Sequence, residues 1–196
     1  MRIDEATEKP AFIAIASPPT RGVSELEFLI KPVPGSTTEE LCALDAGGAL
    51  QLSPVMGKGF DMSKLPAEDV KTVLLFATGS GISPIKALIE TPEDAGGLEA
   101  ASRSDVRLYY GALAPETMAF RELFEAWEAS GVRVIPVFSQ ACEDEKCYVQ
   151  HVCREEGVSD GPSTGAVLVG QKEMVQDVKA LLAECGMPEE NVVMNF

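Results

Sequence analysis

The stretch that decides the fold is Ala77-Thr78-Gly79-Ser80-Gly81-Ile82-Ser83-Pro84. It follows directly on the solidly apolar run 72–77, which is typical of a strand buried on both faces of a parallel sheet. The two glycines allow a tight turn and a close approach of a ligand to the backbone. Ser83 suits an N-cap and Pro84 a first helical position, which predicts a helix over 84–90. The positive end of that helix would face the loop, as in a pyrophosphate site.

Strands and helices continue to alternate downstream of this loop. Apolar runs predict strands at 107–110, 132–138 and 166–169, and an edge strand within 191–196. Amphipathic helices are predicted over 120–127, ending at Gly131, and over 174–182, ending at Gly186. This order implies right-handed βαβ units and a doubly wound parallel sheet, which binds ligands at the carboxyl ends of its strands.

Residues 1–66 have a different sequence pattern. Short apolar runs at 11–16, 25–31 and 49–52 predict strands between Pro and Gly turns, and a short helix is predicted over 38–44. Short strands with such turns indicate part of a small antiparallel barrel. We therefore predict an incomplete β-barrel domain over 1–66 and a nucleotide-binding α/β domain over 67–196.

The composition narrows the range of partners. A net charge of −15 disfavours nucleic acid and anionic membrane surfaces, because like charges repel. No apolar run approaches the roughly 20 residues that span a bilayer. The acidic surface would suit a basic partner, although solubility is the simpler explanation.

The five cysteines are expected to be reduced, because their number is odd and a chain of this size needs no disulfides to fold. Cys142, Cys147 and Cys153 lie close together, with His151 between two of them. Their spacing matches no standard zinc or iron–sulfur motif, so no metal is expected.

The motifs of 70–196, taken in chain order, resemble those of the flavin-dependent reductase superfamily typified by ferredoxin-NADP reductase. The stretch 78–84 is similar to its Gly-Thr-Gly-Ile-Ala-Pro loop, with Ser80 in the Thr place. The run 108–111 is similar to its second strand and following glycine. Val169-Gly170 and Met174 match a further stretch, in which relatives have a cysteine at position 169. The loop reads much as in the plant and algal fruit-protein-like oxidoreductase group.

This resemblance implies that NADP or NAD binds across the loop. Ser139 opens the segment for the adenosine end, where Lys146, Tyr148 and Gln150 fit a Lys-x-Tyr-x-Gln pattern. Gln140 replaces the family's basic residue, so both nucleotides stay open. The implied nucleotide-side residues are Gly79, Ser80, Gly81, Ile82, Pro84, Gly111, Ser139, Lys146, Tyr148, Gly170 and Met174, with the terminal Phe196 as a cover for the nicotinamide or flavin.

The resemblance also implies a flavin, FAD or FMN, between the two domains. Its implied contacts are Ser17, Gly35, Thr37 and Thr38. The family's Arg-x-Tyr-Ser flavin motif falls on 11–14, however, where all three side-chain roles are lost. Phe12 is offset by one residue, which in a strand means the opposite face.

Two functions follow from the resemblance. One is a flavin-dependent NAD(P)H oxidoreductase that passes electrons to an external acceptor, which could be a protein. Hydride transfer needs no acid–base residue, so none is expected to be catalytic. The other is a flavin-less, non-catalytic nucleotide-binding or assembly module. Missing barrel strands would leave an open edge for association. The plant and algal relatives imply a chloroplast location, with the cytoplasm as the alternative.

Overall fold

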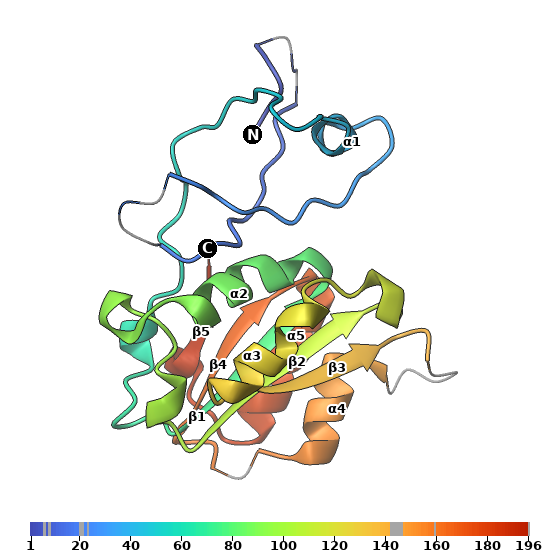
Figure 1. Cartoon of the computed structure of the whole chain (residues 1–196). Coiled ribbons are helices and arrows are strands. Elements are labelled where there is room, and N and C mark those ends of the chain that lie inside the picture. The colour runs from blue at the N-terminus through green and yellow to red at the C-terminus, as the bar shows by residue number, and fades with distance from the viewer. Residues whose placement is uncertain are drawn as a thin grey trace.

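The computed structural model describes residues 1–5, 7, 9–19, 22, 24–141, 147–158 and 160–195. Its centre is a five-stranded parallel sheet with the strand order β3-β2-β1-β4-β5 (Figure 1). The strands are β1 (Thr72–Thr78), β2 (Asp105–Ala112), β3 (Arg133–Phe138), β4 (Thr164–Val169) and β5 (Val192–Met194). The α-helices are α1 (Thr37–Cys42), α2 (Ile82–Glu90), α3 (Phe124–Ala129), α4 (Val149–Glu156) and α5 (Lys172–Glu184). Short 3-10 turns include η2 (Gly79–Gly81), η6 (Arg121–Leu123) and η8 (Glu189–Asn191).

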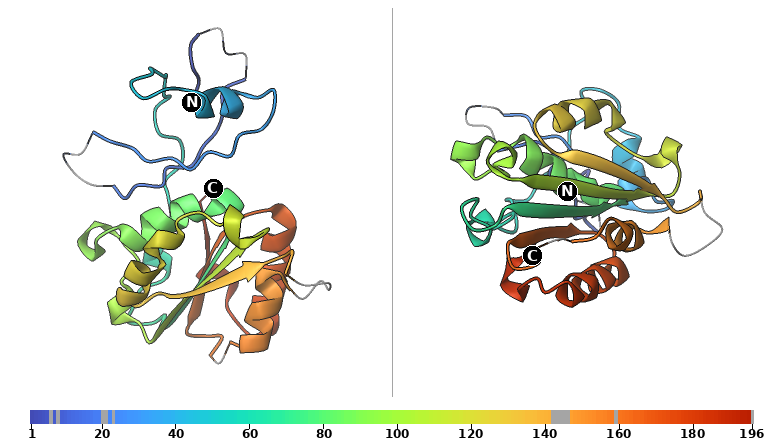
Figure 2. Two further views of the ribbon diagram at one scale, coloured as in Figure 1. Left: turned by 45° about the vertical axis from the view of Figure 1, so that its right-hand side comes forward. Right: turned by 90° about the horizontal axis from the view of Figure 1, so that it is seen from below.

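Helices cover both faces of the sheet, as the view from below shows (Figure 2). One apolar cluster joins the sheet to α2 and α3, with Ile85 and Trp127 among its buried side chains. The other joins the opposite face to α4 and α5, with Cys153 and Leu182 among its members. The predicted doubly wound α/β fold is confirmed, including an edge strand near the end of the chain.

The predicted start of the helix after the glycine loop is wrong. Helical winding begins at Gly79 as η2 and runs directly into α2, so Ser83 and Pro84 lie inside the first turn of α2 and Gly81 takes the cap position. Ser83 is only 1% exposed and its hydroxyl makes no hydrogen bond. A hydroxyl that is packed against the core cannot cap the helix.

Two more helices differ from the sequence prediction. In the helix predicted over 120–127, Phe120 adopts a left-handed conformation (φ +60°), so the winding starts after it, as the 3-10 turn η6, and becomes α-helical only at Phe124. Helix α4 was not predicted, because it has only two turns and most of its residues are polar, although Val149, Val152 and Cys153 form an apolar face. The predicted stops at Gly131 and Gly186 are confirmed, as both have positive φ just beyond α3 and α5.

The N-terminal segment lies above the sheet domain in Figure 1 as extended chain around α1. Its described residues pair only at isolated antiparallel bridges, Arg2 with Gln51 and Ile15 with Phe28. The strands predicted at 11–16, 25–31 and 49–52 are therefore wrong as continuous strands. A ladder needs a partner along its whole length, and here each crossing supplies one residue pair.

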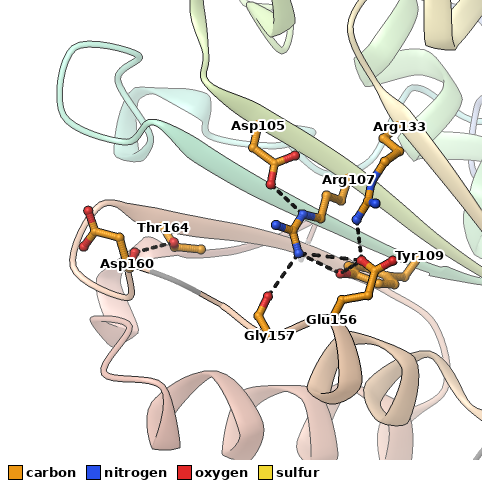
Figure 3. Close-up of polar contacts among 8 residues, drawn as sticks. All are labelled: Asp105, Arg107, Tyr109, Arg133, Glu156, Gly157, Asp160 and Thr164. Atoms are coloured by element: carbon orange, nitrogen blue, oxygen red, sulfur yellow. Dashed lines mark hydrogen bonds and ion pairs between the residues drawn. The ribbon is translucent and has the colours of Figure 1, made fainter.

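An ionic network ties α4 to the amino edge of the sheet, opposite the glycine loop (Figure 3). Arg107 on β2 pairs with Asp105 at 2.5 Å and donates to the carbonyl of Gly157 at 3.0 Å. Glu156, at the end of α4, pairs with Arg133 on β3 at 2.5 Å and accepts from Tyr109 at 2.8 Å. The network fixes the direction in which α4 runs, so the start of α4 points to the opposite edge.

The cysteines depart in part from expectation. Cys42, Cys153 and Cys185 are free thiols, whereas Cys147 is disulfide-bonded, so the prediction of reduced thiols is wrong at that position. An odd count excludes the pairing of every cysteine, but it does not exclude one pair. Cys142 lies outside the described residues. Within the described ranges, no group of three metal-ligating side chains comes together and no helix is long and apolar enough to cross a membrane.

Candidate functional site

The candidate site is built on the loop that leaves β1 at the carboxyl edge of the sheet. Gly79 has φ +54°, and a Cβ there would meet no atom within 4 Å, so its outer side is open. The first amides of a helix have no partner within it, and here those amides start at the same open glycine. The arrangement suits an anionic group that approaches the backbone closely.

The other glycines of the site allow neighbouring loops to pack tightly. A Cβ at Gly81 would lie 2.7 Å from the carbonyl oxygen of Val169 at the end of β4. A Cβ at Gly170 would clash with Met174 and with Thr78. A Cβ on Gly111 would approach Thr78 Cγ2 to 3.1 Å. The strand ends of β1, β2 and β4 thus meet in one compact edge that larger residues would push apart.

Tyr110 supports the glycine loop through a hydrogen bond from the strand β2. Its ring is buried, and its hydroxyl donates to the carbonyl of Gly79 at 3.4 Å and accepts from the amide of Ala119 at 3.2 Å. Burial raises the pKa of Tyr110, partly offset by the hydrogen bond from Ala119, so the hydroxyl stays protonated as a donor.

The structure brings most of the predicted nucleotide-side residues to this edge. Gly79, Ser80, Gly81, Ile82 and Pro84 form η2 and the first turn of α2. Gly111 lies beside Thr78 in the register of β1 and β2. Gly170 and Met174 follow β4, where Met174 belongs to the first turn of α5.

The residues predicted for the adenosine end lie farther along the same edge. The amide of Ser139, just after β3, donates to the carbonyl of Ala112 at 3.0 Å. Tyr148 precedes α4 and is 49% exposed, and its ring lies 5.8 Å from the ring of His151. Lys146 and Phe196 lie outside the described residues.

The four residues predicted for the flavin lie in the N-terminal segment, where all are engaged by the chain itself. Ser17 Oγ accepts from the amide of Glu27 at 3.1 Å, and Thr37 Oγ1 donates to a backbone carbonyl at 2.8 Å. Thr38 Oγ1 accepts from the amide of Val33 at 3.1 Å. The amide of Gly35 donates to the Glu39 carboxylate at 2.7 Å.

Two contributors to the site, Tyr110 and Thr78, and a buried lysine next to it escaped the sequence prediction. Tyr110 supports Gly79, and Thr78 Oγ1 accepts from the amide of Gln171 at 3.4 Å, which links the ends of β1 and β4. Lys86 is buried on α2. A signal for it existed, since a lysine four residues after Ile82 falls on the apolar face of the helix.

A shallow hollow of about 320 Å³ lies elsewhere, between α4 and α5, and is lined by Gln150, His151, Arg154 and Asp177 among others. None of the residues lining it belongs to the glycine loop. We place the candidate site at the strand ends, because the open glycine backbone and the helix start converge there.

The class of protein that this fold and loop define is an oxidoreductase nucleotide-binding domain. Residues 75–180, more than half of the chain, match the family described as "Oxidoreductase NAD-binding domain". The match begins inside β1 and ends inside α5. The chain therefore belongs to this family.

Its relatives can be named individually. The "Fruit protein pKIWI502" of Actinidia deliciosa is 43% identical over 205 residues, which cover 99% of this chain and 63% of that protein. The chain thus spans less than two thirds of the relative's length. This similarity and the solved structures confirm the resemblance to the ferredoxin-NADP reductase superfamily and its fruit-protein-like group.

Two solved structures show the same fold at low sequence identity. A ferredoxin NADP+ reductase from Neisseria gonorrhoeae with bound FAD and NADP matches 93% of this chain and 77% of its own, at 19% identity and a TM-score of 0.67. The CS-b5R domains of human Ncb5or in the NAD+ form match 96% of this chain and 56% of their own, at 18% identity and a TM-score of 0.68. Because each match exceeds the extent of 67–196, it includes part of the N-terminal segment.

Proposed function

We propose that the chain is a flavin-dependent NAD(P)H oxidoreductase that takes electrons from NADPH or NADH and passes them through FAD or FMN to an external acceptor. The observation that carries the proposal is the open backbone at Gly79, at the start of a helix and at the carboxyl edge of the sheet. The solved relatives support it, since one contains FAD and NADP and the other is in its NAD+ form.

The nucleotide fits the residues that are present. The amides at the start of η2 would donate to its pyrophosphate, while Tyr110 keeps the carbonyl of Gly79 turned inward. Ser139 and the half-exposed ring of Tyr148 would hold the adenosine end, the latter by stacking. The chain therefore supplies binding and orientation.

The fit for a flavin is less complete. When bound, a flavin would accept a hydride from the nicotinamide and release electrons to the acceptor. The carboxylate of Glu39 occupies the amide of Gly35, at the place proposed for the flavin pyrophosphate. A phosphate would have to displace this exposed carboxylate, so we derive no further step there.

This contact favours a second candidate function, a flavin-less nucleotide-binding module. Phe12 is 81% exposed, and the neighbouring positions of the expected flavin motif carry only aliphatic side chains. A protein with this segment would keep the glycine loop and bind the nucleotide without a flavin.

The visible absorbance of the purified chain separates the two candidates. It is measured with and without added FAD or FMN, and again after NADPH or NADH. Flavin bands that bleach with a nucleotide would establish the oxidoreductase and identify the preferred nucleotide. Nucleotide binding without any bound flavin would reject it in favour of the second candidate.

The Gly81→Ala variant tests the nucleotide site itself. Its Cβ would lie 2.7 Å from the backbone oxygen of Val169, so the loop must shift. We expect nucleotide binding, measured by calorimetry, to weaken at least tenfold. Gly48→Ala is the matched control, since its Cβ would likewise lie close to a backbone oxygen, 2.9 Å from that of Asp45, but in the N-terminal segment. Equal affinities in both variants would show that the nucleotide binds elsewhere.

Location and association complete the proposal. A chloroplast location is supported only by the plant origin of the fruit protein, and imaging of a fluorescent fusion of the full-length protein in plant cells would test it.

The exposed apolar side chains of the N-terminal segment support association through this region. Sedimentation of the chain at increasing concentration would reveal it, and a constant monomer mass would argue against it.

A further inference from the structure

Lys86 is a buried cation at the junction of three parts of the molecule. It lies on α2, two residues after Pro84, and only 5% of it is exposed. Its Nζ donates to Glu90 at 2.7 Å and to Glu27 at 2.8 Å, and lies 3.4 Å from the carbonyl oxygen of Ala16. No residue of the glycine loop is among these partners.

Two of the three partners come from the N-terminal segment. The amide of Ala16 donates to the carbonyl of Glu27 at 2.8 Å, and the amide of Glu27 donates to Ser17 Oγ at 3.1 Å. Ile15 and Phe28 form an isolated bridge beside them. Lys86 thus binds the point where two extended stretches of the segment cross. It contacts the backbone of one stretch and a side chain of the other.

The third partner extends the junction to the α3 layer. Glu90 accepts from Trp127 Nε1 at 3.1 Å through its second oxygen. The ring of Phe120 lies 5.5 Å from Lys86 Nζ, within range of a cation–π contact. Phe120 holds the positive φ that interrupts the winding before α3, a conformation that surrounding contacts must maintain.

These contacts indicate that Lys86 fixes the relative positions of its partners more than it stabilises the fold. A buried ammonium gains little net stability over an apolar side chain, because the loss of its hydration offsets the attraction of its partners. Three fixed acceptors, however, define where a lysine nitrogen can lie. Since α2 continues directly from η2, the position of Lys86 is rigidly coupled to the glycine loop.

We propose that Lys86 is a positioning residue that sets the N-terminal segment, and Ser17 with it, against the nucleotide loop. The effect of Lys86 on catalysis rests on the proposed function, since the alignment matters to hydride transfer between a nucleotide and a flavin. The anchoring of the segment by Lys86 does not depend on that function. Without Lys86 the crossing of the segment at Ala16 and Glu27 should loosen from α2 while the sheet domain stays folded.

The test uses Lys86→Met in the full chain, with amide hydrogen exchange as the main measurement. The amides of Ala16 and Glu27 should exchange at least tenfold faster, while those of β1 and β4 should not change. The fluorescence of Trp127, the single tryptophan of the chain, should shift because its acceptor Glu90 is released. Lys71→Met is the matched control, because Lys71 Nζ also donates to a backbone carbonyl, that of Ala67, at 2.7 Å.

A second variant keeps the inference testable if Lys86→Met fails to fold. Glu27→Gln removes only the charged partner from the N-terminal segment and leaves α2 intact. It should accelerate the same two amides and spare the sheet. Unchanged exchange at Ala16 and Glu27 in either folded variant would overturn the inference. Equal acceleration in the sheet would also overturn it, because Lys86 would then stabilise the core as a whole.

Kinetics separate this inference from the proposed function. If the wild-type chain reduces a flavin, Lys86→Met should lower kcat about tenfold and leave KM for the nucleotide within twofold, since the loop is intact. An unchanged kcat would overturn the positioning role. A wild-type chain that reduces no flavin would refute the proposed function, while the exchange and fluorescence results would still decide whether Lys86 anchors the segment.

Discussion

The two regions of the molecule are built on different principles. Within the described residues, only three of the buried apolar side chains, Ala16, Leu41 and Leu65, lie in 1–66, and both apolar clusters are centred on 67–196. Of the ten exposed large apolar side chains, seven lie in the N-terminal segment: Phe12, Leu26, Val33, Leu50, Leu52, Val55 and Met56. The sheet domain has its own core, whereas the segment depends on what it contacts.

This difference separates the two binding sites that the family combines. The nucleotide loop is supported by strand ends and glycine contacts within the sheet domain. The proposed flavin residues are held by hydrogen bonds within a segment that has little core of its own. We therefore expect nucleotide affinity to survive changes that loosen the segment, and flavin affinity to be lost with them.

The largest expected effect comes from removing a core side chain of the sheet domain. Leu75, on β1, is fully buried, and Leu75→Ala should cost about 2–5 kcal/mol of unfolding free energy in urea. Leu41→Ala in α1 is the matched substitution in the segment. It should accelerate amide exchange within 1–66 and leave the global urea midpoint nearly unchanged. A comparable drop of the midpoint in both variants would show that the two regions unfold as one unit.

The same contrast explains how far the sequence alone could lead. The strands of the sheet domain were predictable because each contains a short apolar run, and the loop because its glycines directly follow the run of β1. The segment was not, because its apolar runs meet partners at single bridges that no local pattern encodes. The domain boundary between residues 66 and 67 stays a prediction.

Within the site, the sequence identified backbone positions better than side-chain partners. Glycines mark close approaches whatever surrounds them, so Gly81, Gly111 and Gly170 were predicted together. The roles of Tyr110 and Lys86 depend on residues 9 to 70 positions away along the chain. Such pairings arise only when the chain has folded.

A smaller effect is expected from the ionic network at the amino edge of the sheet domain. Arg107→Gln would leave the carboxylates of Asp105 and Glu156 with fewer partners in a site that is mostly shielded, and should cost about 1–3 kcal/mol in urea. Arg154→Gln is the control, because Arg154 and Glu184 pair at 2.9 Å with both side chains about 60% exposed. That loss should stay below about 0.5 kcal/mol. Equal losses would mean that the shielding of the network contributes nothing.

The last effect is a pH dependence of the sheet domain that is negligible at neutral pH and appears only at alkaline pH. Cys153 on α4 is fully buried, and burial is the main cause that raises the pKa of its thiol from 9.0 to about 11. Between these values the unfolded chain loses the proton and the folded chain keeps it. The unfolded state therefore binds fewer protons, and stability falls as the pH rises through this window. The loss should reach about 1–3 kcal/mol near pH 11.

Cys153→Ala should remove this part of the alkaline loss. Burial also raises the pKa of Tyr109, which interacts with Cys153, so the difference between wild type and variant reports the thiol together with its effect on Tyr109. Cys42→Ala, at an exposed position of α1, controls for the loss of a thiol in the N-terminal segment. Its unfolding free energy should follow the wild-type pH profile. A Cys153→Ala profile that also parallels the wild type would show that the thiol is accessible to water, and that the core around α4 opens more readily than its burial indicates.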